Sequence, residues 1–561
     1  MANLVKRIYS NFRGVDFRGE EINLVRSPDS LNMWKDYKET ESIRTRPDIE
    51  LIEEFEGTIW GVFFYTVGTK RMMLVHCGTK LYKIENEKRT ELFSGLNPVR
   101  GASFIYNNIW YFKDGINYLE YDGETIKQVE GYVPTTTIGR KPNGGGTPYE
   151  DVNMLSDERI NSFLADGVSK DYYLDTLEID STKLPEVRVN GSVVASSGYT
   201  VDSVNGIIKF KTAPSIPLTD GQDNVTVRFS KRVVGHRERI TQCTLLQVFD
   251  NRVFFSGNPD YPNVVFHCSL NNPRYCSDLD YYNEGLDLAK VTGLVAGNNA
   301  LWVFKEPSQA NTTVFYHNPS IDSDYGKIYP STHSSISTGC IGKALNFNDD
   351  IVFFSERGME AINGDVTTEQ VLAHRSSLVD RKLTAEENYK DMLLEEYEGY
   401  LFVFVGSKVY LADSRAMFTN ENHNEYEWFY WDLGKKITSA IVYEGVLYLG
   451  SENGLYTLTD VTKDVESYWV TPLDKFNYPQ YLKTTNKRGC VVEALGDLTI
   501  SAKTNKGEWE EIESYSNVTD YLVVKRKFKK FKDLQLKFSS SKRFSLEHAT
   551  LECFVGGYIK R

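Results

Sequence analysis

The densest chemical feature of the sequence is a basic run near its end, "VVKRKFKKFKDLQLKF" at residues 523–538. Such a row of cations binds phosphate groups through salt-dependent release of counterions, or it docks on an acidic protein surface. Residues 521–561 carry eleven Lys and Arg against three Asp and Glu (+8), which leaves −21 on the rest of a chain whose total is −13. We therefore favour an acidic protein partner over DNA. The candidate contact residues, with Phe528 and Phe531 interleaved, are Lys525, Arg526, Lys527, Lys529, Lys530 and Lys532.

One turn has the beginning of a calcium-binding loop but not its end. In "IDSDYGKIY", Asp322 and Asp324 precede Gly326, whereas the twelfth position is His333 instead of the bidentate Glu that such a loop needs. The eight histidines show no H-x-x-x-H or H-E-x-x-H spacing. The sequence therefore predicts a surface turn here, and no metal.

Carboxylate pairs are the other possible source of chemistry. Asp349 with Asp350 and Glu386 with Glu387 are adjacent in the chain, but a two-carboxylate hydrolase needs acids that face each other from different segments. The chain has no G-x-S-x-G nucleophile motif, no Walker A loop and no dinucleotide fingerprint. We predict no enzymatic activity, no catalytic residue and no cofactor.

The cysteines and the distribution of apolar residues indicate the cellular compartment in which the chain folds. Seven cysteines are scattered without a C-x-x-C pair, which is typical of buried thiols in a reducing compartment. The start, "MANLVKRIYSNFRG", has no apolar signal region, and no run of about 18 apolar residues occurs. We expect a chain that folds in a cytoplasm and has no membrane partner.

A recurring hairpin sets the architecture that carries these residues. Each copy has a turn of Asn, Asp, Glu or Gly followed by four or five β-forming residues, and successive copies begin 47, 51, 50 and 45 residues apart. This is the length of one four-stranded propeller blade, which cannot bury both faces without neighbouring blades. We predict an all-β protein with a β-propeller of six to eight blades. The clear copies start at Val253 ("DNRVFF"), Ala300 ("NNALWVF"), Ile351 ("DDIVFF"), Leu401 ("EGYLFVF") and Val446 ("EGVLYL"), and earlier copies lie at Ile109 and around Met73.

The spacing breaks twice, which predicts further domains. After "KPNGGGTPYE" (141–150), alternating apolar residues meet Asn-Gly turns at 190–191 and 205–206, the pattern of antiparallel hairpins. We expect an extended N-terminal arm (1–50), a first propeller segment (51–148), an inserted antiparallel β-sandwich (149–235), a second propeller segment (236–465) and a C-terminal β domain with the basic run (466–561). "LTAEENYKDMLLEEY" (383–397), with Thr384 as N-cap, is the best candidate helix.

The order of these segments resembles that of tailed-bacteriophage virion proteins of the tail-nozzle, tail-tubular or packaged-DNA-stabilisation type. The arm "NFRGVDFRGEEINLVRSPDSLNMW" with Arg46-Pro47-Asp48, the blades "RVFFSGNPDYPN" and "LWVFKEPS", and the close "FVGGYIKR" carry the resemblance. Where that family has an R-P-G-like step, Asp48 replaces the usual Gly.

The resemblance implies a virion component, assembled in the host cytoplasm as a homo-oligomeric ring that is commonly a hexamer. Such a ring would contact neighbouring neck or tail proteins and enclose double-stranded DNA that passes without sequence specificity. Its role would be mechanical: to retain packaged DNA and allow its ejection. Two alternatives stay open, a receptor- or polysaccharide-binding virion propeller (an adhesin) and, less favoured, a propeller glycosidase.

Overall fold

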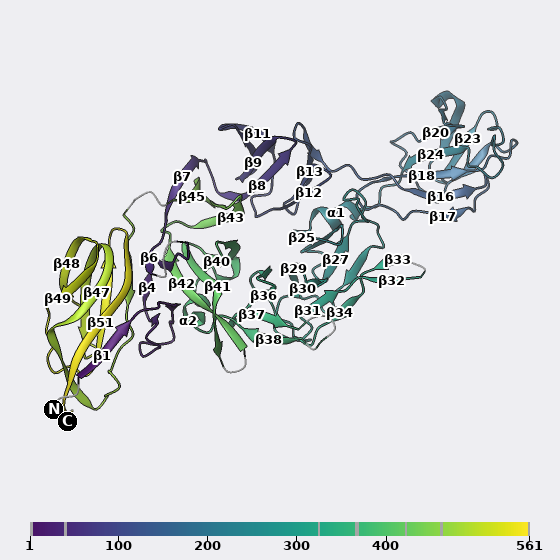
Figure 1. The fold of residues 1–561 in the computed structure, drawn as a ribbon. Coiled ribbons are helices and arrows are strands. Elements are labelled where there is room, and N and C mark those ends of the chain that lie inside the picture. Colours follow the sequence, from purple (N-terminus) through teal and green to yellow (C-terminus); the bar gives the residue numbers. More distant parts are fainter. Residues whose placement is uncertain are drawn as a thin grey trace. The chain divides into compact units, whose positions relative to one another are not determined.

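The computed structural model describes residues 4–558 except 39–41, 324–325, 365–367, 369, 421–422 and 460–463. Strands dominate these residues (Figure 1). The described helices are two short α-helices, α1 (His236–Thr241) and α2 (Asp380–Leu383), and two 3₁₀ turns, η1 (Ser196–Gly198) and η2 (Tyr389–Asp391). The prediction of an all-β protein is confirmed.

Seven four-stranded sheets recur along the described chain. Neighbouring strands pair antiparallel, as in the ladders β26–β27 and β40–β41. This arrangement is consistent with β-propeller blades. The sheets are β8 (Ile59–Val67), β9 (Lys70–Cys77), β10 (Lys80–Glu85), β11 (Lys88–Ser94); β12 (Ala102–Tyr106), β13 (Ile109–Lys113), β14 (Tyr118–Tyr121), β15 (Ile126–Gln128); β25 (Leu245–Phe249), β26 (Arg252–Ser256), β27 (Val264–His267), β28 (Tyr281–Asn283); β29 (Val291–Gly297), β30 (Ala300–Lys305), β31 (Val314–His317), β34 (Ser331–His333); β35 (Ala344–Phe347), β36 (Asp350–Ser355), β37 (Gly358–Asn363), β38 (Val371–His374); β39 (Leu393–Tyr397), β40 (Tyr400–Val405), β41 (Lys408–Asn420), β42 (His423–Asp432); and β43 (Ile437–Tyr443), β44 (Val446–Ser451), β45 (Gly454–Thr459), β7 (Asp48–Glu54).

The chain divides into two compact units. The first comprises Met1–Phe64, Met72–Glu91 and Ser334–Arg561, and the second comprises Tyr65–Arg71 and Leu92–His333. In each unit, successive sheets pack face to face through shared clusters of buried side chains.

Alternation along single strands shows how each sheet buries both faces. On β40, Phe402 and Phe404 join one buried cluster, whereas Leu401 and Val403 join another. A strand that is buried on both faces reads as a continuous apolar run instead of an alternating one. This explains the repeated "YLFVF" and "RVFF" signatures in the sequence.

Paired left-handed turn residues close the central hairpins. Asn107 and Asn108 have φ values of 47° and 58°, and Asn298 and Asn299 have 51° and 59°. Two successive positive φ angles are typical of the type I′ turn, which Asn, Asp and Gly tolerate best. The Asn-rich signature at each blade therefore has a conformational cause.

The last sheet takes its fourth strand from the N-terminal region. β7 pairs antiparallel with β45, from Asp48 opposite Thr459 to Glu54 opposite Gly454. The boundary predicted at residue 50 falls inside β7. Because β7 lies far before β45 in the chain, neither segment carries a local sequence signal of their pairing.

The inserted domain consists of two sheets around a core that includes Phe163, Tyr172, Val187 and Ile208. Its ordered strands begin at residue 135, earlier than the predicted start at 149. One ladder, β16 with β18, is parallel, so the prediction of a purely antiparallel sandwich was wrong there. The six-stranded sheet is β16 (Thr135–Arg140), β17 (Thr147–Pro148), β18 (Glu158–Phe163), β20 (Glu186–Val189), β21 (Ser192–Val193) and β24 (Val225–Ser230), and the three-stranded sheet is β19 (Asp171–Tyr173), β22 (Tyr199–Asp202) and β23 (Ile207–Phe210).

Strands from both ends of the chain build the C-terminal sheet. β1 pairs with β51 from Leu4 opposite Phe554 to Tyr9 opposite Ala549. β4 pairs with β46, and β6 pairs with β51. The strands are β1 (Leu4–Tyr9), β4 (Ser30–Leu31), β5 (Met33–Lys35), β6 (Ile43–Thr45), β46 (Ser467–Val470), β47 (Tyr481–Thr504), β48 (Glu510–Val518), β49 (Tyr521–Val524), β50 (Leu534–Ser540) and β51 (Phe544–Tyr558), and beside them β2 (Gly14–Val15) pairs parallel with β3 (Arg26–Ser27).

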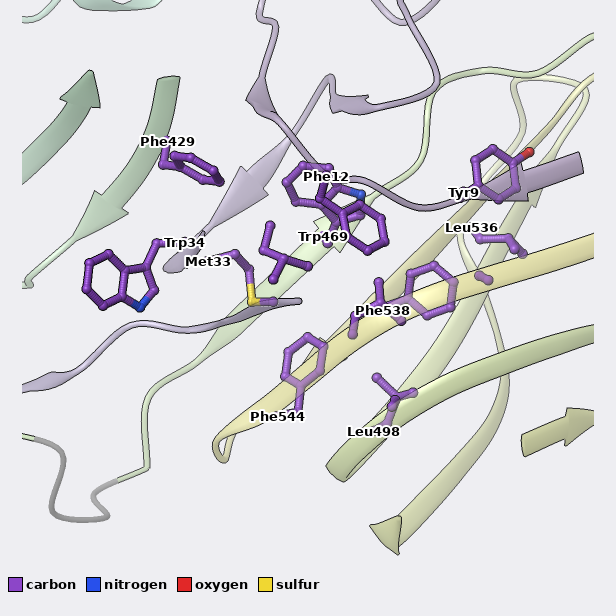
Figure 2. Close-up of a cluster of buried hydrophobic side chains, with 14 of the residues drawn as sticks. Tyr9, Phe12, Met33, Trp34, Phe429, Trp469, Leu498, Leu536, Phe538 and Phe544 are labelled. Atoms are coloured by element: carbon purple, nitrogen blue, oxygen red, sulfur yellow. The ribbon is translucent and has the colours of Figure 1, made fainter. Parts of the chain in front are cut away.

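The N-terminal arm is buried between β42 and the C-terminal sheet within the same chain. Phe12, Met33 and Trp34 of the arm share one buried cluster with Phe429 of β42 and Trp469 of β46, and Figure 2 shows Phe12 beside Trp469. The rings of Phe12 and Trp469 meet edge to face at 5.1 Å. The arm thus fixes the C-terminal domain to the neighbouring blade, β39–β42.

The helix predicted for 383–397 was wrong. α2 ends at Leu383, and residues 393–397 form β39, which pairs with β40 through the turn at Glu398 and Gly399. The hairpin ladder with β40 outweighs a local N-cap and first-turn signal, since propensity is a weak influence beside tertiary pairing.

Candidate functional site

The predicted basic residues lie on one connecting segment of the C-terminal domain. Residues 525–533 join β49 to β50, and all six cations predicted as contact residues are exposed. Phe528 (8% exposed) and Phe531 (1%) point the opposite way, into the core. The segment is therefore amphipathic, with its cations outside and its rings inside.

Backbone hydrogen bonds hold this segment against β47. Phe531 and Lys483 exchange backbone bonds of 3.0 and 2.8 Å, and the Thr485 amide donates to the Phe528 carbonyl at 3.0 Å. The Thr485 hydroxyl accepts from the Phe528 amide at 2.8 Å. The segment continues the line of β49 along β47 as an irregular edge strand.

A bulge in β47 adds two cations that the sequence analysis missed. The ladder of β47 with β51 shifts between Thr485 and Cys490, and the extra residues include Lys487 and Arg488, both exposed. Because Thr485 contacts Phe528 and Cys490 pairs with Val524, the bulge faces residues 525–527. The "NKRG" of 486–489 has turn composition inside an apolar pattern, which is the one signal that could have indicated it.

We call these eight cations the basic surface: Lys487, Arg488, Lys525, Arg526, Lys527, Lys529, Lys530 and Lys532. Within the part of the chain that the structure describes, Arg526 alone of this set forms an ion pair, with Glu510. Beneath the surface lies Lys483, whose ammonium donates to the Lys532 carbonyl at 2.6 Å and whose pKa is lowered by burial. The surface presents a dense positive charge from a backbone that is already ordered, which suits electrostatic docking.

The calcium-like turn is part of a short hairpin. Asp322 ends β32 (Ser320–Asp322), which pairs with β33 (Gly326–Ile328), and Asp324 lies outside the described residues. No group of three or more His, Cys, Asp or Glu with the geometry of a metal site occurs among the described residues.

The adjacent carboxylates take part in local contacts. Asp349 has a φ of 64° in the turn before β36, and Asp350 accepts hydrogen bonds from Arg375 (3.0 Å) and Tyr426 (2.9 Å). Glu386 accepts from the Tyr410 hydroxyl at 2.7 Å. The bond from Tyr426 of β42 to Asp350 of β36 joins two four-stranded sheets, so these carboxylates have a structural use.

Two histidines form carboxylate pairs. His317 is fully buried, with Nε2 2.8 Å from Glu284 and Nδ1 2.8 Å from the Tyr329 carbonyl. His374 donates to Asp380 at 2.6 Å and lies 3.3 Å from Glu360. Burial lowers the pKa of His374, but hydrogen bonds to Asp380 and Glu360 and their charges outweigh it and raise this pKa to about 10.

All seven cysteines are buried free thiols. Burial raises the pKa of Cys243 and Cys490 to about 12, so neither carries a reactive thiolate at neutral pH. Among the described helices, none has the length and apolar composition needed to cross a membrane.

Comparisons with known proteins find distant structural similarity alone. No family model matches the sequence, and no curated protein matches it. The structure is similar to BamB from Moraxella catarrhalis (10% identity, TM-score 0.33, 73% of this chain and 97% of that one) and to Hsv2 from Kluyveromyces lactis (9%, 0.31, 74% and 94%). It is also similar to the Cps50 (Swd1) β-propeller domain of Myceliophteria thermophila (10%, 0.23, 49% and 72%). Similarity at this level carries no argument about function, so the propeller interpretation rests on the strand pairing itself.

Proposed function

We propose that this chain is a non-catalytic structural subunit of a bacteriophage neck or tail, which assembles as a ring around a DNA channel. The ring retains packaged DNA and lets it leave on infection. In this proposal the four-stranded sheets are the blades of a β-propeller, and the chain also carries the inserted domain and the C-terminal β domain.

The pairing of β7 with β45 supports the propeller interpretation. A strand from the start of the chain completes the sheet formed by β43, β44 and β45 near the end of the repeat. In a circular arrangement of blades, the first and last parts of the repeat must be held together. The pairing of an early strand with the last blade does this, since both ends of the repeat then share one sheet.

The observation that carries the assembly role is the exposure of large aliphatic side chains on the inserted domain. Each of seven is more than half exposed, and exposed apolar side chains mark a protein interface where they are neighbours. Leu177 and Val204 are neighbours, because the Glu178 amide donates to the Val204 carbonyl at 3.0 Å. The seven, in chain order, are Val168 (80%), Leu177 (62%), Leu184 (64%), Val193 (59%), Val204 (66%), Ile216 (63%) and Leu218 (93%).

Imaging of the purified full chain tests the proposal. Negative-stain microscopy and mass photometry should find closed rings with a central hole. The double variant L177S/V204S should shift the population toward monomers, whereas I321S, an equally drastic change at a side chain that is 89% exposed on β32, should not. Monomers at every concentration up to about 50 μM, a range that covers assemblies with micromolar Kd, would refute the ring.

The genomic setting gives an independent check. Genes for a portal and a terminase beside this one would support a virion role, and their absence would count against it. Binding of the monomeric full chain to a glycan array would favour the adhesin alternative.

A further inference from the structure

β7 is an acidic strand at the edge of its sheet. Among the described residues it pairs with β45 alone, so no strand covers its other side, although Arg89 donates to the Glu54 carbonyl at 2.8 Å and pairs with Glu53. Leu51 (42%) and Ile52 (45%) are exposed on it, and so are Glu50 and Glu54. Neither Glu50 nor Glu54 forms an ion pair within the described part of the chain.

The exposed apolar side chains and the negative charge of β7 together determine which partners can pair with it. An exposed edge with apolar side chains is a template for pairing with another chain. Two copies of β7 repel each other, because each brings the carboxylates of Glu50 and Glu54, whereas Asp48 and Glu53 pair with Arg46 and Arg89. A partner that is itself positively charged meets no such barrier.

The basic surface is the complementary edge. Residues 525–531 run along β47 as an irregular outer strand, with Lys525, Lys527 and Lys529 exposed and without ion pairs among the described residues. Both surfaces belong to the first compact unit. One unit therefore carries two different surfaces of opposite charge.

We infer that the acidic strand β7 of one copy docks on the basic surface of the next copy, in a head-to-tail contact. This inference rests on the proposed ring. Closed rings require a heterologous contact, in which two different patches of the same chain meet, and an isologous patch would stop at a dimer. Charge complementarity then sets the direction of assembly, and it does so in a chain whose net charge of −13 otherwise opposes self-association.

Charge reversal with rescue tests the contact. E50K/E54K and K527E/K529E are each expected to raise the protein concentration at half-assembly at least about tenfold, measured by mass photometry and sedimentation velocity. The combined variant, which exchanges the charges, should return to within about threefold of the wild type. E356K/E387K makes the same charge change at two exposed carboxylates outside β7 and should leave assembly unchanged.

Each other outcome overturns the inference. Unchanged assembly of E50K/E54K removes β7 from the contact, and failure of the combined variant to recover shows that the two surfaces do not meet. Loss of duplex DNA binding by K527E/K529E with unchanged assembly assigns the basic surface to nucleic acid. In all three cases the wild-type ring, and with it the proposed function, still stands; a wild type that stays monomeric removes both.

Discussion

The buried pair of Arg26 and Glu427 gives the sharpest test of how the arm is held. Arg26 of β3 donates to both carboxylate oxygens of Glu427 on β42, at 2.8 and 2.7 Å. The side chains are 9% and 0% exposed, and the guanidinium lies 4.2 Å from the Phe418 ring. R26M keeps most of the volume of the side chain and removes its charge.

The expected loss follows from the charge that stays behind. Removing one partner of a buried ion pair costs about 3–5 kcal/mol. Burial already raises the pKa of Glu427 and Arg26 acts to lower it, so in R26M this pKa rises further and the carboxyl takes up a proton. Protonation and the remaining Arg13, 3.9 Å away, limit the loss to about 3 kcal/mol. In a unit of roughly 300 residues this lowers Tm by about 5 °C.

The pH dependence has a defined sign. A carboxyl whose folded pKa lies above its unfolded value of 4.5 binds more protons when folded. The free energy of unfolding of R26M therefore falls as pH rises from about 4.5 through the folded pKa, and the deficit relative to the wild type is larger at pH 8 than at pH 5.

Denaturant unfolding followed by tryptophan fluorescence measures these differences, since Trp34, Trp431 and Trp469 lie in the same buried cluster. R26M/E427L should recover to within about 1 kcal/mol of the wild type. E21Q, which breaks the exposed pair of Glu21 and Lys475, should lose less than about 1 kcal/mol. A loss below about 1 kcal/mol for R26M at pH 8, or no recovery in the double variant, would refute the reasoning.

Three further changes test other parts of the structure. Because the pKa of His374 is raised to about 10, the stabilising contribution of its charge is complete below pH 6.5 and is lost as pH rises through 10. The difference in the free energy of unfolding between the wild type and H374Q should therefore shrink by on the order of 3 kcal/mol between pH 6.5 and 10.5. An unchanged difference would contradict the pairing of His374 with Asp380 and Glu360. F528A removes a buried anchor of the basic surface, a change that costs about 3–5 kcal/mol in a core, and should speed tryptic cleavage within 525–532, whereas F554A, at a ring that is 39% exposed, should not. In G14A the new Cβ would lie 2.0 Å from the Trp428 carbonyl oxygen at a φ of 110°, so the arm should become sensitive to proteolysis, unlike in G19A, where a Cβ meets nothing within 4 Å.

The blade hairpins could be read from the sequence because their determinants are local. Turn pairs such as Asn107-Asn108 adopt two left-handed conformations, which few residues tolerate, and the strands after them are apolar on both faces. The exposure of the cations of 525–532 also has a local determinant. Phe528 and Phe531 point to the core, and the cations around them stay outside.

The remaining features depend on contacts between distant residues. The strand at 393–397 has helix-forming residues and becomes β39 because β40 offers a ladder. β7 completes a sheet whose other strands lie some 400 residues later, and the cations of the 486–489 bulge meet 525–527 through pairing with β49. Propensity and periodicity act within a window of a few turns and carry no record of such partners.

The buried cluster that joins these elements leads to a last prediction. Ile49 of β7, Phe12 of the arm, Trp469 of β46, and Phe528 and Phe531 beneath the basic surface all belong to it. One packed interior therefore holds both proposed docking surfaces in a fixed relation, and close-packed cores transmit a local loss of packing.

Loosening this interior should weaken assembly without altering either surface. F12A should destabilise the first unit by about 3–5 kcal/mol, and F12L by about 1 kcal/mol, because Phe12 is 1% exposed and meets the Trp469 ring edge to face. If assembly depends on a fixed distance between the two docking surfaces, the protein concentration at half-assembly rises in the order wild type, F12L, F12A. The exposed charges are the same in all three proteins. Equal assembly of all three as folded proteins would show that the two surfaces act independently of the core between them.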